Sequence, residues 1–204
     1  MTFNIQFSRT HSNQVTSVYI ANYAGFNVLF QDTDLVWFKN PIPFFDSHPV
    51  DSSFMDDGAR SPRFAPYFSN SGFYFLKYNS KTRYLMHRMM LSVFEISYTH
   101  SHQGTLTKYM IEAHDLVKLQ ISALSQLDFP SGKMFHHNKT YMKQLHLGLV
   151  DPYVFHMCWT ANSKDKIKNF LSINKWYVRD ESRCAQPGTG KVPADLLNSC
   201  CATP

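Results

Sequence analysis

Two aspartates separated by one residue interrupt an apolar stretch near the N-terminus, and this feature constrains the fold more than any other. The stretch is "NVLFQDTDLVWF", with apolar runs at 27–30 and 35–38 on either side of Asp32 and Asp34. A short apolar run of this kind predicts a buried strand. Burying two carboxylates is costly unless a cation compensates their charge. The pair therefore indicates a functional site at the end of a strand, and the alternative is a solvated acidic turn.

The segments around the pair predict an α/β fold. Residues 12–26 are predicted to form a helix, with Val15 and Val18 on one face and Gly25 at its C-terminal cap. The strand at 27–30 follows at once, and ligands of open α/β sheets bind outside the carboxyl ends of strands. Further along, the sequence predicts a loop at 41–66, a turn at 70–72, strands at 73–78 and 153–157, helices at 82–97, 105–127 and 163–178, and a turn at 129–135.

Several polar side chains could form one site with the acidic pair. At i and i+2 of a regular strand, Asp32 and Asp34 point to opposite faces, but at a strand-to-loop turn they can converge on one Mg²⁺ or Mn²⁺ ion. His156 ends a downstream strand and is either a third ligand or a core histidine. Lys164 and Lys166 either contact a diphosphate or lie on a solvated helix face. A cation that bridges to a diphosphate is typical of transfer from a nucleotide sugar.

Other candidate residues are less specific. Asn70 and Gly72 suit a close approach of the backbone to a sugar, but they suit any β-turn equally well. His136 and His137 are adjacent, which is poor geometry for one metal ion, and we expect them in a loop. Trp37 is expected to be a core residue or a pocket wall.

The charge distribution argues against a nucleic-acid partner. The net charge is +5, but the cations are scattered except for a cluster at 164–175, and no RNA-recognition signature is present. A phosphorylated small molecule fits this charge better. No stretch approaches the roughly 18 apolar residues of a membrane span, and the N-terminus lacks the pattern of a signal peptide. The chain as given is expected to be soluble.

The cysteines leave the redox compartment open. Cys184 could pair with Cys200 or Cys201 in an oxidising lumen, or all the cysteines could be free thiols. These three residues lie in a segment, 181–204, that we expect to be an irregular tail after a domain formed by residues 1–180.

Three blocks of the sequence, taken in order, resemble the nucleotide-diphospho-sugar transferases, especially the plant and algal wall xylosyl- and arabinosyltransferases. The blocks are "YAGFNVLFQDTDLVWFKNP", "SNSGFYFLKYN" and "PYVFHMCWTANSKDKIKNFLSINKWYV". The resemblance extends over about residues 15–178. It implies part of a GT-A fold, which is a Rossmann-like three-layer α/β/α sandwich. It also implies a retaining transfer from a nucleotide-diphosphate sugar to a glycan or glycoprotein acceptor, helped by Mn²⁺ or Mg²⁺.

The resemblance assigns roles to individual residues. Asp32 and Asp34 would be the D-x-D pair, in which Asp34 holds the metal ion and Asp32 holds the metal ion or the ribose. His156 would match the third metal ligand. Asn70 and Gly72 would line the pocket of the donor sugar.

Three further residues are assigned with less support from the motifs. Lys164 or Lys166 would contact the diphosphate. Asp115 falls where the family often has an Asp-Gln pair near the donor sugar, although Leu116 follows it here in place of the Gln. Asp115 is also the candidate for a nucleophilic carboxylate in a retaining reaction.

The sequence departs from the family pattern before the acidic pair. About thirty residues precede Asp32, where such folds place the first βαβ units that hold the nucleobase. The resemblance therefore implies an incomplete or reduced form, and its full-length form would be a type II membrane protein of the Golgi lumen. Two alternatives stay open, namely an inactive remnant that binds glycans or a partner chain, and a metal-dependent hydrolase built on Asp32, Asp34 and His156.

Overall fold

A computed structural model of the chain describes residues 5–58, 68–99 and 101–178. Its helices are α1 (Ile5–Tyr23), α2 (Ile42–Ser47), α3 (Ser80–Leu91), α4 (Val93–Thr99), α5 (His102–Val117), α6 (Gly132–His137), α7 (Lys139–His146) and α8 (Ser163–Ser172). Its strands are β1 (Val28–Gln31), β2 (Leu35–Trp37), β3 (Ser52–Asp56), β4 (Ser69–Leu76), β5 (Ile121–Leu124) and β6 (Val154–His156). The chain forms two compact units, Met1–Trp159 and Thr160–Pro204.

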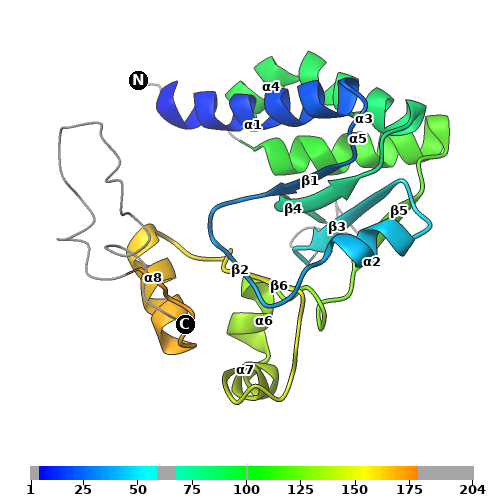
Figure 1. Cartoon of the computed structure of the whole chain (residues 1–204). Helices are drawn as coiled ribbons and strands as arrows, with labels where there is room; N and C mark the ends of the chain where they lie inside the picture. Colours follow the sequence, from blue (N-terminus) through cyan, green and yellow to red (C-terminus); the bar gives the residue numbers. More distant parts are fainter. Residues whose placement is uncertain (1–4, 59–67, 100, 179–204) are drawn as a thin grey trace, which may run out of the picture. The chain divides into compact units, whose positions relative to one another are not determined.

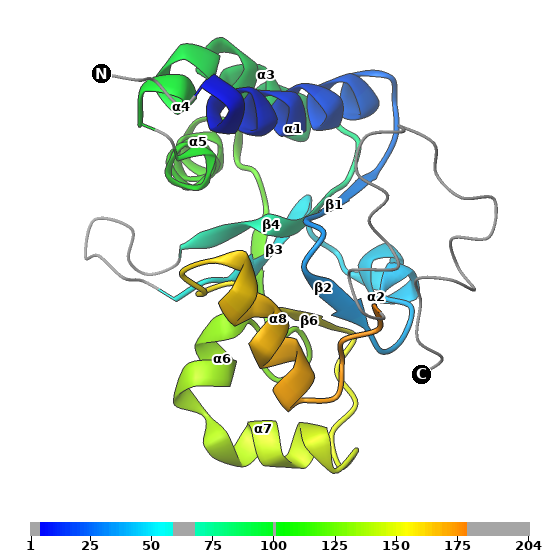
Figure 2. The same cartoon turned by 90° about the vertical axis from the view of Figure 1, so that its left-hand side faces the viewer.

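The first unit is built on a four-stranded mixed sheet with the order β1-β4-β3-β5, which Figures 1 and 2 show from two sides. Strand β4 runs antiparallel to β1 and β3, whereas β5 runs parallel to β3. Strands β1, β3 and β5 therefore finish at the same end of the sheet, which we call the carboxyl end, and they begin at the opposite, amino end. A separate two-stranded ribbon pairs β2 antiparallel with β6.

Both faces of the sheet are covered by apolar side chains. Helices α1, α3, α4 and α5 lie over one face (Figure 1). The core that they share with the sheet includes Val15, Val18, Phe54, Leu85, Met86, Met89, Ile96, Leu106, Met110 and Ala113. On the other face, α2, the segment after β5 and the segment before β6 enclose an aromatic cluster that includes Phe45, Phe73, Phe75 and Phe129. The predicted α/β fold class is confirmed.

Side-chain caps and glycine explain where several helices begin and end. Gly25, at φ +100°, follows α1 as predicted, since a left-handed residue suits a helix C-terminus. The side chain of Asn79 accepts from the Lys81 and Thr82 N–H groups and starts α3. Ser101 caps α5 in the same way. Lys118, at φ 57°, ends α5 and turns the chain toward β5.

Part of the predicted secondary structure is wrong in the first half of the chain. The stretch 41–66, predicted to be a loop, contains α2 and β3 within the part that the structure describes. The stretch 70–72, predicted to be a turn, lies inside β4, where the register of its pairing with β3 shifts. The helix predicted at 82–97 is two helices that meet at Ser92.

In the second half, the helix predicted at 163–178 ends at Ser172, and two other predictions are wrong. The helix predicted at 105–127 ends at Val117, and the same stretch then forms β5. The turn predicted at 129–135 leads into α6, so His136 and His137 are helical residues and not loop residues. In both cases the secondary structure changes within a few residues. The hydrophobic periodicity of the sequence cannot locate such a short transition.

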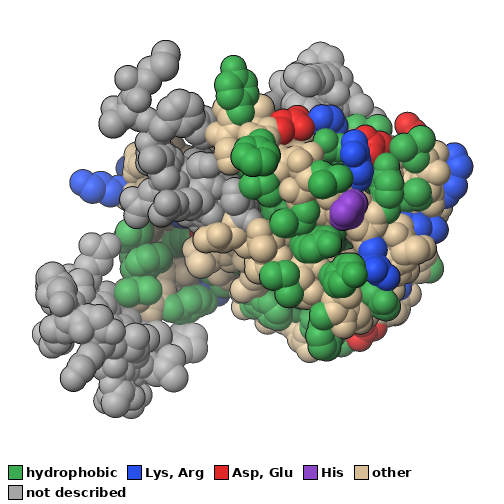
Figure 3. All heavy atoms as spheres, turned by 90° about the horizontal axis from the view of Figure 1, so that it is seen from above, with side chains coloured by type: hydrophobic (Ala, Val, Ile, Leu, Met, Phe, Trp, Pro, Cys, Tyr) green, Lys and Arg blue, Asp and Glu red, His purple; other side chains and the backbone are tan. Residues whose placement is uncertain are grey.

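The helical layer also presents apolar side chains to its outside. Figure 3 views this layer from above and shows hydrophobic side chains interspersed with lysines and arginines. The exposed apolar side chains of α1, α3 and α4 include Ile20, Tyr23, Leu91, Phe94 and Tyr98. Among the residues described, no helix combines the length and the apolar character needed to cross a bilayer.

The second unit is described only as far as residue 178. It contains α8, which begins where the Asn162 side chain accepts from the Asp165 N–H. Phe170 is the buried residue of this helix, and its ring packs on Trp176 at a centroid distance of 6.4 Å. The predicted tail with its three cysteines, and the predicted domain boundary at 180, lie outside the described residues.

Candidate functional site

Asp32 and Asp34 converge because the chain leaves one sheet and enters another between them. The Asp32 N–H donates to the Gly72 carbonyl at 2.8 Å, so Asp32 continues the pairing of β1 with β4. The Asp34 carbonyl accepts from the Met157 N–H at 3.0 Å and so belongs to the ribbon of β2 and β6. The bend at Thr33 separates these two pairings. The two carboxylates therefore do not follow the alternation of faces within a single strand, and they can point toward the same site.

The ribbon brings His156 to the acidic pair from more than a hundred residues away. Leu35 pairs with His156, so the histidine lies beside Asp34, and its Nε2 is 3.2 Å from Asp34 Oδ1. Ligand atoms of Asp32, Asp34 and His156 all lie within 4.8 Å of one another. We call these three residues the acidic cluster. It lies where β1 ends, at the carboxyl end of the sheet.

Gly72 leaves the space that the acidic cluster occupies. A Cβ atom at this position would lie 2.5 Å from both Asp32 Oδ2 and His156 Cε1. Such distances are impossible for a real side chain without movement of its neighbours. The small residue in β4 is therefore required by the packing of the two ligand candidates, and not by a turn.

The chemistry of the acidic cluster fits a divalent cation. Its donor set is two carboxylates and one imidazole, which suits Mn²⁺. His156 is 2% exposed, and its Nδ1 makes no hydrogen bond to the described residues. Gln14 Nε2 donates to Asp32 at 3.3 Å, while the buried Gln14 Oε1 also lacks a partner among the described residues. Burial, and secondarily the Asp32 carboxylate, raise the pKa of the Tyr74 hydroxyl, so this group stays neutral.

Asp57 and Gln103 adjoin the acidic cluster and were not predicted from the sequence. Asp57 directly follows β3 and is 4% exposed, and Gln103 lies in the first turn of α5 and donates to it at 2.8 Å. Burial, followed by the carboxylates of Asp57 and Asp34, raises the pKa of the nearby Cys158 thiol. The signal that could have identified Asp57 is its place after a buried strand, the same signal that identified Asp32.

The structure brings only some of the other predicted residues to this site. Asn70 lies beside it but is buried, with its amide engaged by Asp57 and by the Gly72 N–H. Lys164 and Lys166 lie on α8 in the second unit, and their contact with a diphosphate stays a prediction.

Asp115 is not brought together with the acidic cluster. It is exposed in the last turn of α5, just before the chain enters β5 at the amino end of the sheet. The acidic cluster lies at the carboxyl end. The geometry therefore gives no support to a role for Asp115 beside the donor sugar.

Two other predicted features have structural contacts. His136 Nε2 lies 3.0 Å from the Trp159 carbonyl, and the His137 ring packs edge-on against the Trp159 indole. Trp37 is 44% exposed, so it is no core residue, and its Nε1 donates to Gln31 Oε1 at 2.6 Å.

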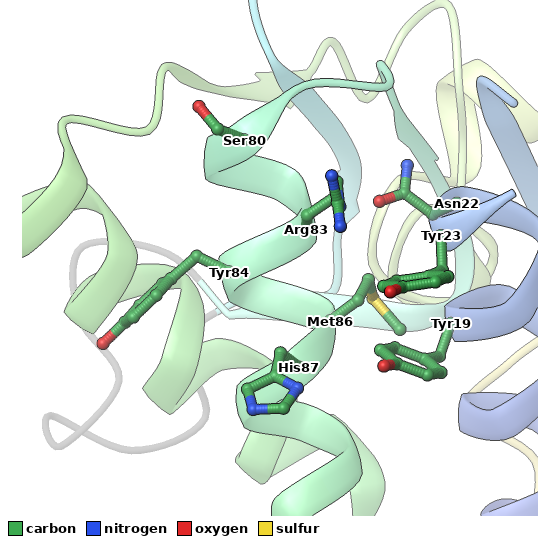
Figure 4. Close-up of a pocket in the computed structure, with 8 residues that line it drawn as sticks. All are labelled: Tyr19, Asn22, Tyr23, Ser80, Arg83, Tyr84, Met86 and His87. Atoms are coloured by element: carbon green, nitrogen blue, oxygen red, sulfur yellow. The ribbon is translucent and has the colours of Figure 1, made fainter. Parts of the chain in front are cut away.

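A cavity of about 300 Å³ lies apart from the acidic cluster, between α1 and α3 (Figure 4). Its lining residues are Tyr19, Asn22, Tyr23, Ser80, Arg83, Tyr84, Met86 and His87. We call it the tyrosine cavity. In Figure 4 the rings of Tyr19 and Tyr23 lie one above the other, and Arg83 lies 4.8 Å from the centre of the Tyr23 ring. Because Ser80 and Arg83 follow the last residues of β4, this cavity lies toward the amino end of the sheet.

Comparison with known proteins agrees with the geometry. Over 172 residues, the chain is 24% identical to a "UDP-D-xylose:L-fucose alpha-1,3-D-xylosyltransferase" of Arabidopsis thaliana, an overlap that covers 78% of this chain and 47% of the relative. The chain thus spans about half the length of that relative. Residues 6–170 match the family described as "Nucleotide-diphospho-sugar transferase", and this range contains the whole acidic cluster. The chain belongs to the nucleotide-diphospho-sugar transferase family.

Proposed function

We propose that this chain is a metal-assisted glycosyltransferase domain that moves a sugar from a nucleotide-diphosphate sugar to a glycan or glycoprotein acceptor. The observation that carries the proposal is the acidic cluster, in which two carboxylates and a buried imidazole converge at the carboxyl end of an α/β sheet. Membership of the nucleotide-diphospho-sugar transferase family supports the same reaction class.

The residues of the acidic cluster would have different roles in binding the metal ion and the donor. Asp34 and His156 would hold a Mn²⁺ or Mg²⁺ ion, and Asp32 would hold the ion or the ribose of the donor. When bound, the ion supplies positive charge that stabilises the departing diphosphate. Lys164 or Lys166 would add a second positive charge to the diphosphate.

The donor and the setting of the reaction belong to the proposal as well. UDP-D-xylose is the first donor to test, and an L-fucoside the first acceptor, because the Arabidopsis relative is named for this pair. The Golgi lumen is the proposed location, in line with the resemblance to plant wall transferases. Retention of the anomeric configuration would be checked by NMR of the product.

The first test is UDP release from UDP-D-xylose in the presence of Mn²⁺, with and without an L-fucoside. We expect release in the native chain and a loss of at least about 100-fold in Asp34→Asn, since removal of a metal ligand removes charge stabilisation in the transition state. The matched control is Asp46→Asn, which changes an exposed carboxylate on α2 and should leave release unchanged. Equal Mn²⁺-dependent turnover in Asp34→Asn and the native chain would overturn the proposal. Release that is indifferent to every acceptor would favour a hydrolase.

The variant Asp115→Asn tests a residue for which the geometry and the sequence resemblance predict different roles. The exposed position of Asp115 at the far end of α5 predicts unchanged turnover. A loss as large as that of Asp34→Asn would instead support the role that the resemblance gives to Asp115.

A further inference from the structure

Asp57 is a buried carboxylate with an unusual set of partners. It is 4% exposed, and no salt bridge to it is present among the described residues. Among the described residues, it accepts hydrogen bonds only from neutral groups. These are Trp159 Nε1 at 2.8 Å, Gln103 Nε2 at 2.8 Å, Asn70 Nδ2 at 3.2 Å and Cys158 Sγ at 3.5 Å. A buried charge without a cation is costly, so a requirement other than stability is needed to explain it.

The carboxylate determines which way two side-chain amides face. An ionised carboxylate can only accept hydrogen bonds, so Asn70 and Gln103 must turn their NH₂ groups toward Asp57. Their carbonyl oxygens are then directed away from it. Asn70 Oδ1 accepts from the Gly72 N–H at 2.8 Å, and Gln103 Oε1 accepts from the Ser71 N–H at 3.4 Å.

The backbone that these amides hold is the wall of the acidic cluster. The Gly72 carbonyl accepts from the Asp32 N–H at 2.8 Å. The Gly72 Cα faces the Asp32 carboxylate and the His156 ring so closely that no Cβ fits between them. A series of hydrogen bonds thus runs from Asp57 through Asn70 and Gly72 to Asp32.

We infer that Asp57 is a positioning residue for the acidic cluster. By fixing the direction of the Asn70 and Gln103 amides, it holds the 71–72 backbone where Asp32 and His156 can share one cation. This inference rests on the proposed function. Asp57 itself touches neither the cation nor the donor in this role, so its removal should weaken metal binding without removing a ligand.

The direct test is Asp57→Asn, which preserves the size of the side chain but replaces one acceptor with a donor. One of the two surrounding amides must then turn, and its NH₂ group would face the Gly72 N–H if Asn70 turns or the Ser71 N–H if Gln103 turns. We expect the affinity for Mn²⁺ to fall by about 10- to 100-fold, the usual cost of losing an outer-shell partner. The measurement is the free Mn²⁺ signal by electron paramagnetic resonance during titration of the chain, which requires no turnover. Amide exchange at Gly72 should become faster in the same variant.

A double variant distinguishes a change in amide orientation from a general loss of structure. Asp57→Asn combined with Asn70→Asp exchanges the amide and the carboxylate, so the Gly72 N–H keeps an acceptor and the two side chains can still bond to each other. We expect it to recover most of the lost Mn²⁺ affinity. If Asp57→Asn does not fold, Asn70→Ala interrupts the same series at its second member and should weaken Mn²⁺ binding by a similar factor.

The control is Asp56→Asn, at the last residue of β3. Asp56 accepts from the Gly58 N–H and from Gln126 Nε2, and neither group reaches the acidic cluster. It should leave Mn²⁺ affinity unchanged. If the native chain binds Mn²⁺ and Asp57→Asn binds it equally well, this inference is wrong while the proposed function stands. If the folded native chain binds no Mn²⁺, the proposed function fails and takes this inference with it.

Discussion

The two ends of the sheet differ in the charge that they present. At the carboxyl end, three acidic residues, Asp32, Asp34 and Asp57, lie near one another and near His156. At the amino end, the tyrosine cavity has no acidic lining residue, and its charged side chain is Arg83. Among the described residues, only the acidic cluster brings three candidate metal ligands within 4.8 Å of one another. The charge and the ligand geometry of the acidic cluster therefore favour this end of the sheet for the proposed metal ion.

This difference also predicts how each end tolerates change. At the carboxyl end, ligand atoms converge within 4.8 Å, so a shift of a few tenths of an ångström matters. At the amino end, the lining of the tyrosine cavity includes the exposed side chains of Arg83 and His87, which can move without affecting the acidic cluster. The same type of substitution should therefore change Mn²⁺ affinity at the carboxyl end, whereas at the amino end it should change only stability.

The largest effect is expected for Gly72→Ala. The added Cβ would meet Asp32 Oδ2 and His156 Cε1 at 2.5 Å and push the two ligand candidates apart. We expect Mn²⁺ affinity to fall at least about tenfold, comparable to the loss of an outer-shell partner. Titration calorimetry with MnCl₂ would measure it. Native affinity in the variant would show that the acidic cluster does not hold the ion.

The matched change at the other end is Gly25→Ala, just after α1. Nothing lies within 4 Å of a Cβ here, but φ is +100°, which strains any residue other than glycine. We expect the free energy of unfolding to fall by about 1 kcal/mol, with Mn²⁺ affinity unchanged. Thermal melting by circular dichroism tests the predicted loss of stability, and a Mn²⁺ titration in parallel tests the unchanged affinity. A weakened metal site in this variant would mean that the two ends are coupled.

A smaller effect is expected for Arg83→Gln in the tyrosine cavity. The guanidinium lies over the Tyr23 ring at 4.8 Å, a contact that contributes at most about 1 kcal/mol at an exposed site. We expect a slight decrease in the melting temperature. UDP and Mn²⁺ affinity should stay within about twofold, as the charge comparison requires. A tenfold loss of UDP affinity would place the nucleotide in the tyrosine cavity.

The smallest effect concerns the helical layer that covers one face of the sheet. Hydrogen bonds from Arg88 lower the pKa of Glu112, which joins α3 to α5. A lowered folded-state pKa contributes stability that is present above the unfolded pKa, about 4.3, and is lost as the pH falls through the folded value. Glu112→Gln should therefore melt lower than the native chain at pH 7, and the gap should close below about pH 4. A gap that is constant with pH would contradict the role of this ion pair.

The sequence was sufficient to predict the class of fold and the position of Asp32 and Asp34. An apolar strand followed at once by carboxylates is a local pattern, and it lies within a few residues. His156 was found by the same pattern at the end of another strand. Their convergence was harder to predict, because the pairing of β2 with β6 joins Leu35 to His156, more than a hundred residues later in the sequence.

The failures have physical causes of their own. Asn70 and Gly72 have the composition of a turn, yet Gly72 lies in β4 because its missing side chain makes room for Asp32 and His156. Asp57 was overlooked because it follows another aspartate and precedes Gly58, which is typical of a solvated turn. Its burial depends on hydrogen-bond donors that are distant in the sequence, such as Gln103 and Trp159. A local sequence pattern cannot predict these contacts.

In the proposed function, the acidic cluster holds a divalent cation beside a diphosphate. The most direct measurement is a calorimetric titration of UDP into the purified chain, with Mn²⁺ and with EDTA, for the native chain and for Asp34→Asn. We expect saturable binding that requires Mn²⁺ and that is absent in Asp34→Asn. Binding of UDP that is equal in Mn²⁺ and EDTA, or no binding by a native chain that melts cooperatively, would contradict it.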